Sequence, residues 1–158
     1  RCDMSEQLKA YFFNNQYLQG IHAGIQAQHC TAEMFAKYEK DNFKDIKQRE
    51  LLHEWADSHK TTIILNGGYA RNIQRLVNLF YNDTSNPYPF SYFCESEEAL
   101  EGCITSVGII LPKRVFEGAR YMSTSSPSLI RDRYTQLNNI TSFELEIMKE
   151  LSQCKLMT

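Results

Sequence analysis

Three polar side chains that could hold a ligand or transfer a proton recur at helical spacing between residues 24 and 35. Gln26, His29 and Glu33 are separated by three and four positions, so a helix places them along one stripe of its surface. A histidine titrates near neutral pH and can act as a general acid or base. Helical spacing alone leaves a second interpretation open, in which the stripe faces solvent or His29 is a hydrogen-bonded core residue.

A second histidine precedes this stripe, at the junction between a polar loop and the expected helix. His22 comes seven residues before His29, which is two helical turns or roughly 10 Å along the axis. That separation is too long for a shared metal ion but suits two groups that flank a ligand. The helix start also offers unpaired backbone N–H groups and a positive dipole end. We therefore expect Gly20, Gly24 and Gln26 to contact a phosphate-bearing ligand.

The sequence does not indicate a metal or disulfide site. The segment from His53 to Asp57 has the form H-E-x-x-D and lacks the second histidine of a zinc-binding helix. The five cysteines include no C-x-x-C pair, so we predict free thiols, no metal and no cofactor. The turn Asn66-Gly67-Gly68 could cradle a phosphate, and a plain strand-to-helix turn is the alternative.

The composition is that of one ordinary globular domain. The chain has 158 residues, of which 42% are hydrophobic and 23% charged, and its net charge is -2. This charge argues against a surface that grips long nucleic acid through many phosphate contacts. No stretch approaches the roughly 18 consecutive apolar residues of a membrane span, and we predict a cytoplasmic protein without a membrane partner.

The apolar pattern predicts an α/β fold. Segments 8–14, 61–65, 88–94 and 103–111 have the pattern of strands, and helices are expected at 21–40, 49–58, 70–80 and 142–154. We predict a mixed sheet of about four strands with helices on both faces, plus a C-terminal helical extension. Residues 4–115 would form the α/β domain, and 116–158 would be a linker and a helical tail that pack on the same domain.

Two motifs in this order resemble a divergent, often phage-encoded branch of the archaeal and eukaryotic type of peptidyl-tRNA hydrolase. Its members carry a glycine-led loop followed by Q-x-x-H-A-x-x-E-F or a close variant. With one extra residue, the counterparts here are Gln26, His29, Glu33 and Phe35. A later motif has an aromatic residue, an acidic pair, and a strand that opens with threonine and ends at proline. Its counterparts are Phe93, Glu95, Glu97 and 105–112.

The resemblance implies hydrolysis of the ester that joins a peptide to the 3′ end of tRNA. The family uses a lysine near the start of the first helix, an acidic residue and a threonine. Glu95 and Thr105 stand at the last two positions, whereas residues 20–28 contain no lysine. We therefore expect His22 and His29 to act with Glu95 and Thr105 as the catalytic set.

Basic residues after the last expected strand allow two interpretations. They form a solvated face, or the tail closes over a phosphate-bearing ligand with Arg120 and Tyr121, since guanidinium groups and aromatic rings suit that task. The basic residues are Lys113, Arg114, Arg120, Arg131 and Arg133.

Two functions are compatible with these features. The acidic balance, the missing lysine and the added tail favour a nucleotide-binding protein that captures or cleaves a compact immune signal of the cyclic dinucleotide or ADP-ribose type. The resemblance favours a peptidyl-tRNA hydrolase with rearranged catalytic groups, which would bind the tRNA 3′ end. A protein-interaction module on an enzyme-derived fold is a third alternative, and a homodimer is left open. As an enzyme, the protein would be a metal-independent ester or phosphodiester hydrolase.

Overall fold

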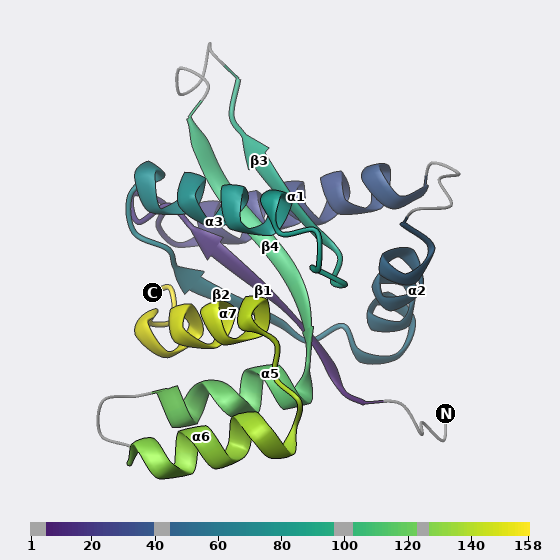
Figure 1. The fold of residues 1–158 in the computed structure, drawn as a ribbon. Coiled ribbons are helices and arrows are strands. Elements are labelled where there is room, and N and C mark those ends of the chain that lie inside the picture. Colours follow the sequence, from purple (N-terminus) through teal and green to yellow (C-terminus); the bar gives the residue numbers. More distant parts are fainter. Residues whose placement is uncertain (1–5, 40–44, 97–102, 123–126) are drawn as a thin grey trace.

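A four-stranded mixed sheet lies at the centre of the fold (Figure 1). Its strands are β1 (Leu8–Asn14), β2 (Thr62–Asn66), β3 (Phe90–Cys94) and β4 (Ile104–Pro112), in the order β2-β1-β4-β3. β1 is parallel to β2 and antiparallel to β4, which is antiparallel to β3. The predicted α/β fold with a mixed sheet is therefore confirmed. The computed structural model describes residues 6–39, 45–96, 103–122 and 127–158.

Helices cover both faces of this sheet. Between β1 and β2 lie α1 (Ile21–Glu39), α2 (Ile46–Glu54) and the π-helical turn η2 (Trp55–His59), and α3 (Ala70–Asn82) leads to β3. After β4 come α5 (Lys113–Gly118), the 3-10 turn η3 (Ala119–Met122), α6 (Ser128–Leu137) and α7 (Ser142–Gln153). Within the described ranges, no helix is long and apolar enough to cross a membrane.

The alternation of side chains along β1 divides the core between the two faces. Ala10 and Phe12 pack in one cluster with residues of α1 and α2, whereas Tyr11 and Phe13 pack in the other with residues of α3 and α7. Figure 1 shows the same division, with α1 behind the sheet and α3 and α7 in front of it. One face therefore belongs to the helix that carries the polar stripe, and the other face holds the C-terminal helices.

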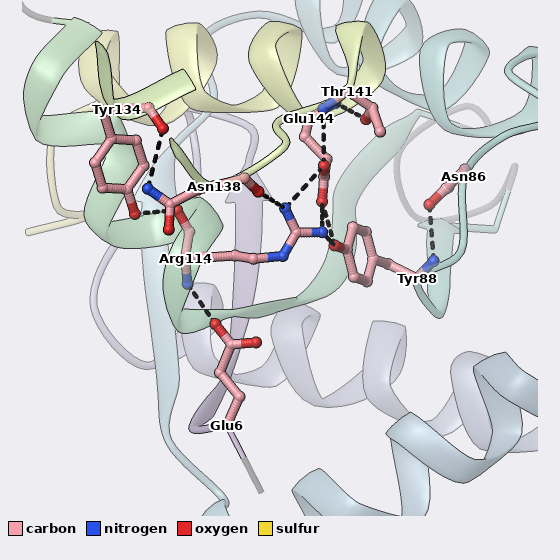
Figure 2. A network of polar contacts seen from close by, with 8 residues as sticks. All are labelled: Glu6, Asn86, Tyr88, Arg114, Tyr134, Asn138, Thr141 and Glu144. Carbon is pink, nitrogen blue, oxygen red and sulfur yellow. Dashed lines mark hydrogen bonds and ion pairs between the residues drawn. The ribbon is translucent and has the colours of Figure 1, made fainter. Parts of the chain in front are cut away.

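A buried ion pair joins the C-terminal helices to the sheet domain (Figure 2). Glu144 of α7 is 1% exposed and accepts hydrogen bonds from Arg114 of α5, from the Tyr88 hydroxyl and from the Thr141 backbone N–H. The Tyr134 hydroxyl of α6 donates to the Arg114 carbonyl at 2.6 Å. The Arg114 guanidinium is therefore bonded to Tyr88, Asn138 and Glu144, which come from three separate segments, and it is not simply part of a solvated face.

Candidate functional site

Buried polar side chains fix α1 against the end of the sheet where β1 ends and β4 begins. Asn14, the last residue of β1, donates from Nδ2 to the Ala23 carbonyl of α1 at 2.8 Å. Ser106 Oγ donates to Asn14 Oδ1 at 2.7 Å, and both residues are fully buried. Because leaving either group unpaired would cost about 1–3 kcal/mol, these bonds hold α1 in one position over β4.

An irregularity in the sheet turns Thr105 toward α1. Phe93 pairs with Ser106, and the next residue, Cys94, pairs with Ile104, so Thr105 is an extra residue on β4. Such a bulge interrupts the alternation of side chains between the two faces and can re-aim a residue. Thr105 Oγ1 donates to Gln26 Oε1 of α1 at 2.7 Å, while Ser106 bonds toward α1 through Asn14. The side chains of Thr105 and Ser106, although successive in β4, thus both form hydrogen bonds on the side of the sheet that faces α1.

Gln26 joins the two sequence motifs in space. Its Nε2 donates to Glu95 Oε2 at 2.9 Å, while its Oε1 accepts the bond from Thr105. Gln26 and Thr105 are buried and Glu95 is half-buried. Three of the expected site residues therefore form one hydrogen-bonded trio, in which the carboxylate is the member with most access to solvent. Glu97, the second residue of the expected acidic pair, lies outside the described part of the chain.

His29 lies beside this trio on the same flank of α1. Its ring centroid is 4.7 Å from that of Phe93, and the Phe93 carbonyl accepts a bond from Thr105 at 3.3 Å. The Nδ1 atom of His29 is buried and has no hydrogen-bond partner, so His29 is not a hydrogen-bonded core residue. His22, one turn before Gln26, is exposed. Gln26 and His29 thus contact β3 and β4, and the stripe is more than a solvated face.

Gly20 and Gly24 lie on the opposite flank of α1. They line a groove of about 480 Å³ together with Ile25, Ile64 and Met157. Positions 24 and 26 are about 200° apart around an α-helix, and Gln26 does not line this groove. The structure therefore does not gather these glycines and the Gln26 side chain into one pocket, and their contact with a ligand through backbone N–H groups stays a prediction.

Arg120 and Tyr121 are also remote from the trio. Thr105 is the second residue of β4, whereas both of these residues lie in η3, beyond α5, which begins where β4 ends. A strand of this length spans about 26 Å, and Figure 1 shows α5 at the opposite end of β4 from β3's last residues. The Tyr121 ring instead lies 4.9 Å from that of Tyr134. Contrary to the expectation from the sequence, Arg120 and Tyr121 therefore do not close over the trio.

The remaining motifs from the sequence, which are the glycine turn, the histidine helix and the cysteines, show no ligand or metal site in the described part of the chain. The Gly67 N–H donates to the Asn14 carbonyl and the Gly68 N–H to Asn66 Oδ1, at 2.7 and 2.9 Å, so neither is available to a phosphate. His53 pairs with Glu39 at 2.7 Å. No group of three or more His, Cys, Asp and Glu gathers within the described ranges. The free thiols there are Cys30, Cys94, Cys103 and Cys154, and Cys2 lies outside those ranges.

The sequence interpretation missed a cleft at the far end of the stripe. The cleft has a volume of about 570 Å³, and its lining comes from α1, α3, β3 and the residue before α2: Glu33, Ala36, Lys37, Asp45, Tyr81, Tyr92, Phe93 and Cys94. Phe93 links it to the trio, because its carbonyl accepts a hydrogen bond from Thr105 and its ring contacts His29 beside the trio. Lys37 follows Glu33 by four positions, so the periodicity of the stripe was the signal that could have found it.

No protein-family model matches the chain, and no curated protein matches its sequence. The resemblance to peptidyl-tRNA hydrolases therefore stays a prediction.

Proposed function

We propose that the protein binds a compact nucleotide-containing ligand along the flank of α1 that faces β3. The observation that carries this proposal is the cleft, whose wall of aromatic side chains continues through Phe93 to His29. Its volume of about 570 Å³ falls in the range of small-molecule sites, which is roughly 300–1,000 Å³.

The chemistry of the lining suits the parts of a nucleotide. Tyr81 and Tyr92 are 52% and 39% exposed, and their ring centroids are 6.1 Å apart. An exposed ring offers a base a stacking surface. The carboxylates of Glu33 and Asp45 can accept hydrogen bonds from ribose hydroxyls, and the Lys37 amine can donate a hydrogen bond to a sugar oxygen. A cyclic dinucleotide or an ADP-ribose-type signal is the ligand class, as for a phage protein that removes an immune signal.

Calorimetric titration with cyclic dinucleotides, ADP-ribose derivatives and an aminoacyl-tRNA end mimic tests this proposal. We expect Tyr92→Ala to weaken binding by about 1–3 kcal/mol, the usual contribution of one stacked base. Tyr17→Ala is the matched control, because Tyr17 is 75% exposed and does not line the cleft. His29→Ala should weaken binding, whereas His53→Ala, which changes a histidine that does not line the cleft, should not. Thermal melts check that each variant is folded. Equal affinity of the wild type and Tyr92→Ala for every ligand that binds would refute the proposed site.

Capture and cleavage are separated by what happens to the bound ligand. Denaturing the purified protein and identifying the released small molecules by mass spectrometry reveals a retained nucleotide, which favours capture. Incubation of a ligand from the panel with excess protein, followed by chromatography, detects products and favours cleavage.

A second candidate function is hydrolysis of the ester at the 3′ end of peptidyl-tRNA. It is favoured by the hydrogen bonds among Gln26, Glu95 and Thr105, which come from the two motifs that carry the resemblance. Release of an N-acylated amino acid from its tRNA by the wild type, and its loss in Thr105→Val and Glu95→Gln, would support this function. Absence of turnover in the folded wild type would exclude it.

A further inference from the structure

Lys37 is an amine held in a fixed place at the cleft. Its Nζ donates to the Phe90 carbonyl at 3.2 Å and lies 3.4 Å from the centroid of the Phe90 ring. The rings of Tyr81 and Tyr38 are 4.7 and 5.0 Å from the same atom. Lys37 also lines the 570 Å³ cleft. A long side chain that is normally mobile in solvent is therefore restrained where a bound molecule can reach it.

Burial around Lys37 increases the share of its neutral, nucleophilic form. Burial lowers the pKa of Lys37 from 10.5 to about 8, although the Asp45 carboxylate raises it. Such an amine is neutral in a larger fraction of molecules near neutral pH than an ordinary lysine. The ring contacts oppose part of this change in pKa, because a ring face stabilises an ammonium ion. Partly desolvated lysines of this kind form imines with carbonyl compounds.

We propose that Lys37 captures an aldehyde ligand as an imine in this cleft, and that the ligand is a nucleotide with a reducing ribose. The ligand class rests on the proposed function. The open-chain form of a reducing ribose presents an aldehyde carbon, to which Nζ forms a bond. The carbonyl oxygen leaves as water with two protons that originate on the amine, so that amine and aldehyde give imine and water without an oxidant or reductant. The step is reversible, because water hydrolyses the imine back to the amine and the aldehyde.

The charge of the cleft favours a sugar at Lys37 over a second phosphate. Two carboxylates, Glu33 and Asp45, and one ammonium belong to its lining, so a ligand with phosphates on every side would meet repulsion. Hydroxyl groups instead donate to those carboxylates. A reducing nucleotide sugar presents hydroxyls and an aldehyde at one end and its phosphates at the other, and only the first end needs to enter beside Lys37.

Trapping with sodium cyanoborohydride tests the proposal, because it reduces an imine to a stable amine. The protein is incubated at pH 7.5 with ADP-ribose, or with ADP as the ligand that lacks a reducing sugar, and adducts are located by peptide mass spectrometry. Lys9 is the matched control lysine, since its Nζ lies 4.4 Å from the centroid of the Phe116 ring but does not line the cleft. We expect an ADP-ribose adduct at Lys37 at least tenfold above that at Lys9, no adduct with ADP, and loss of the adduct in Lys37→Arg but not in Lys9→Arg.

The outcomes separate this inference from the proposed function. Equal adducts at Lys37 and Lys9, or calorimetric binding of ADP-ribose without any trapped adduct, overturn imine capture and leave nucleotide binding standing. Adduct formation at Lys37 with ribose 5-phosphate, in a protein that binds none of the nucleotides, supports the lysine chemistry and overturns the proposed function. The position of the adduct in the wild type decides the matter even if Lys37→Arg does not fold.

Discussion

The ion pair between Arg114 and Glu144 provides a sharp test of how the C-terminal helices are held (Figure 2). Glu144→Gln keeps the size of the side chain and an oxygen that can still accept the Thr141 N–H at the start of α7. It removes the charge that receives bonds from Arg114 and Tyr88. The substitution therefore isolates the charged interaction from the helix cap.

The expected loss follows from burial. Hydrogen bonds to a charged group contribute roughly 1.5–3 kcal/mol, and breaking a fully buried pair costs about 3–5 kcal/mol. The Glu144 side chain is 1% exposed but that of Arg114 is 33% exposed, so solvent can partly stabilise the unpaired arginine. We expect Glu144→Gln to lower the free energy of unfolding by about 2–3 kcal/mol, which for this chain length lowers Tm by about 4–12 °C.

Urea unfolding at neutral pH measures the change, and Glu146→Gln on the same helix is the control. Glu146 pairs with Lys149, and both side chains are about half exposed, at 54% and 50%, so its replacement should change stability by less than about 0.5 kcal/mol. The single variant Arg114→Met and the double variant of Glu144→Gln with Arg114→Met complete a cycle that gives the coupling energy of the pair. If the two glutamate variants were equally stable, the buried pair would contribute nothing beyond a surface pair.

The same pair predicts how stability depends on pH. Burial by itself would raise the pKa of Glu144, but bonds from Thr141 and Tyr88 and the charge of Arg114 outweigh it, and the pKa lies below the ordinary 4.5. A lowered carboxyl pKa stabilises the fold fully above the unfolded value and loses that contribution as pH falls through the folded value. The stability difference between wild type and Glu144→Gln should be constant at pH 6–8 and shrink below about pH 4.5. A difference that grew toward acid pH would contradict this sign.

Three further substitutions test the packing of α1, each by urea unfolding. Gly108→Ala should destabilise by about 1–3 kcal/mol, because the added Cβ would lie 2.6 Å from buried Phe12 ring atoms and 3.3 Å from Cys30 Sγ; a neutral effect would mean that this ring can move. Gly24→Ala should stabilise by about 0.5–1 kcal/mol, since no atom lies within 4 Å of its added Cβ, and a loss would show that α1 needs this glycine. Thr105→Val should cost about 1–3 kcal/mol by leaving the buried Gln26 Oε1 without its donor, whereas wild-type stability would show that water replaces the hydroxyl.

The sheet was predictable because its apolar segments are local features. The first strand was expected at 8–14, where it lies, and the apolar run of 103–111 became β4 at Ile104–Pro112. α5 and η3 were not expected, because their six and four residues are too short to display a helical period. Within the linker and tail expected at 116–158, residues 123–126 lie outside the described residues, and Ser128 begins α6.

The site was predictable only where helical geometry sufficed. Gln26 and His29 were placed on one flank from their spacing, and the same geometry also puts Gly24 on another flank, although the sequence interpretation grouped it with Gln26. The orientation of Thr105 depends on a bulge in the pairing of β3 with β4, which the sequence of one strand does not reveal. Lys37 looked like an ordinary charge near a helix end, because Tyr81 and Phe90, which surround it, come from α3 and β3.

The distribution of charge along the α1 flank ranks nucleotide binding ahead of ester hydrolysis. Hydrolysis at the trio would develop negative charge on an ester oxygen, which needs a cation or converging donors. The bonds among Gln26, Glu95 and Thr105 supply one carboxylate and no positive charge. Lys37 is eleven residues after Gln26, or about 16 Å along the helix. Phe93 spans part of that gap, because its carbonyl accepts from Thr105 while its ring lines the cleft. A ligand anchored at Lys37 in the cleft can therefore extend past Phe93 toward Glu95, whereas in the described part of the chain no lysine or arginine bonds to the trio.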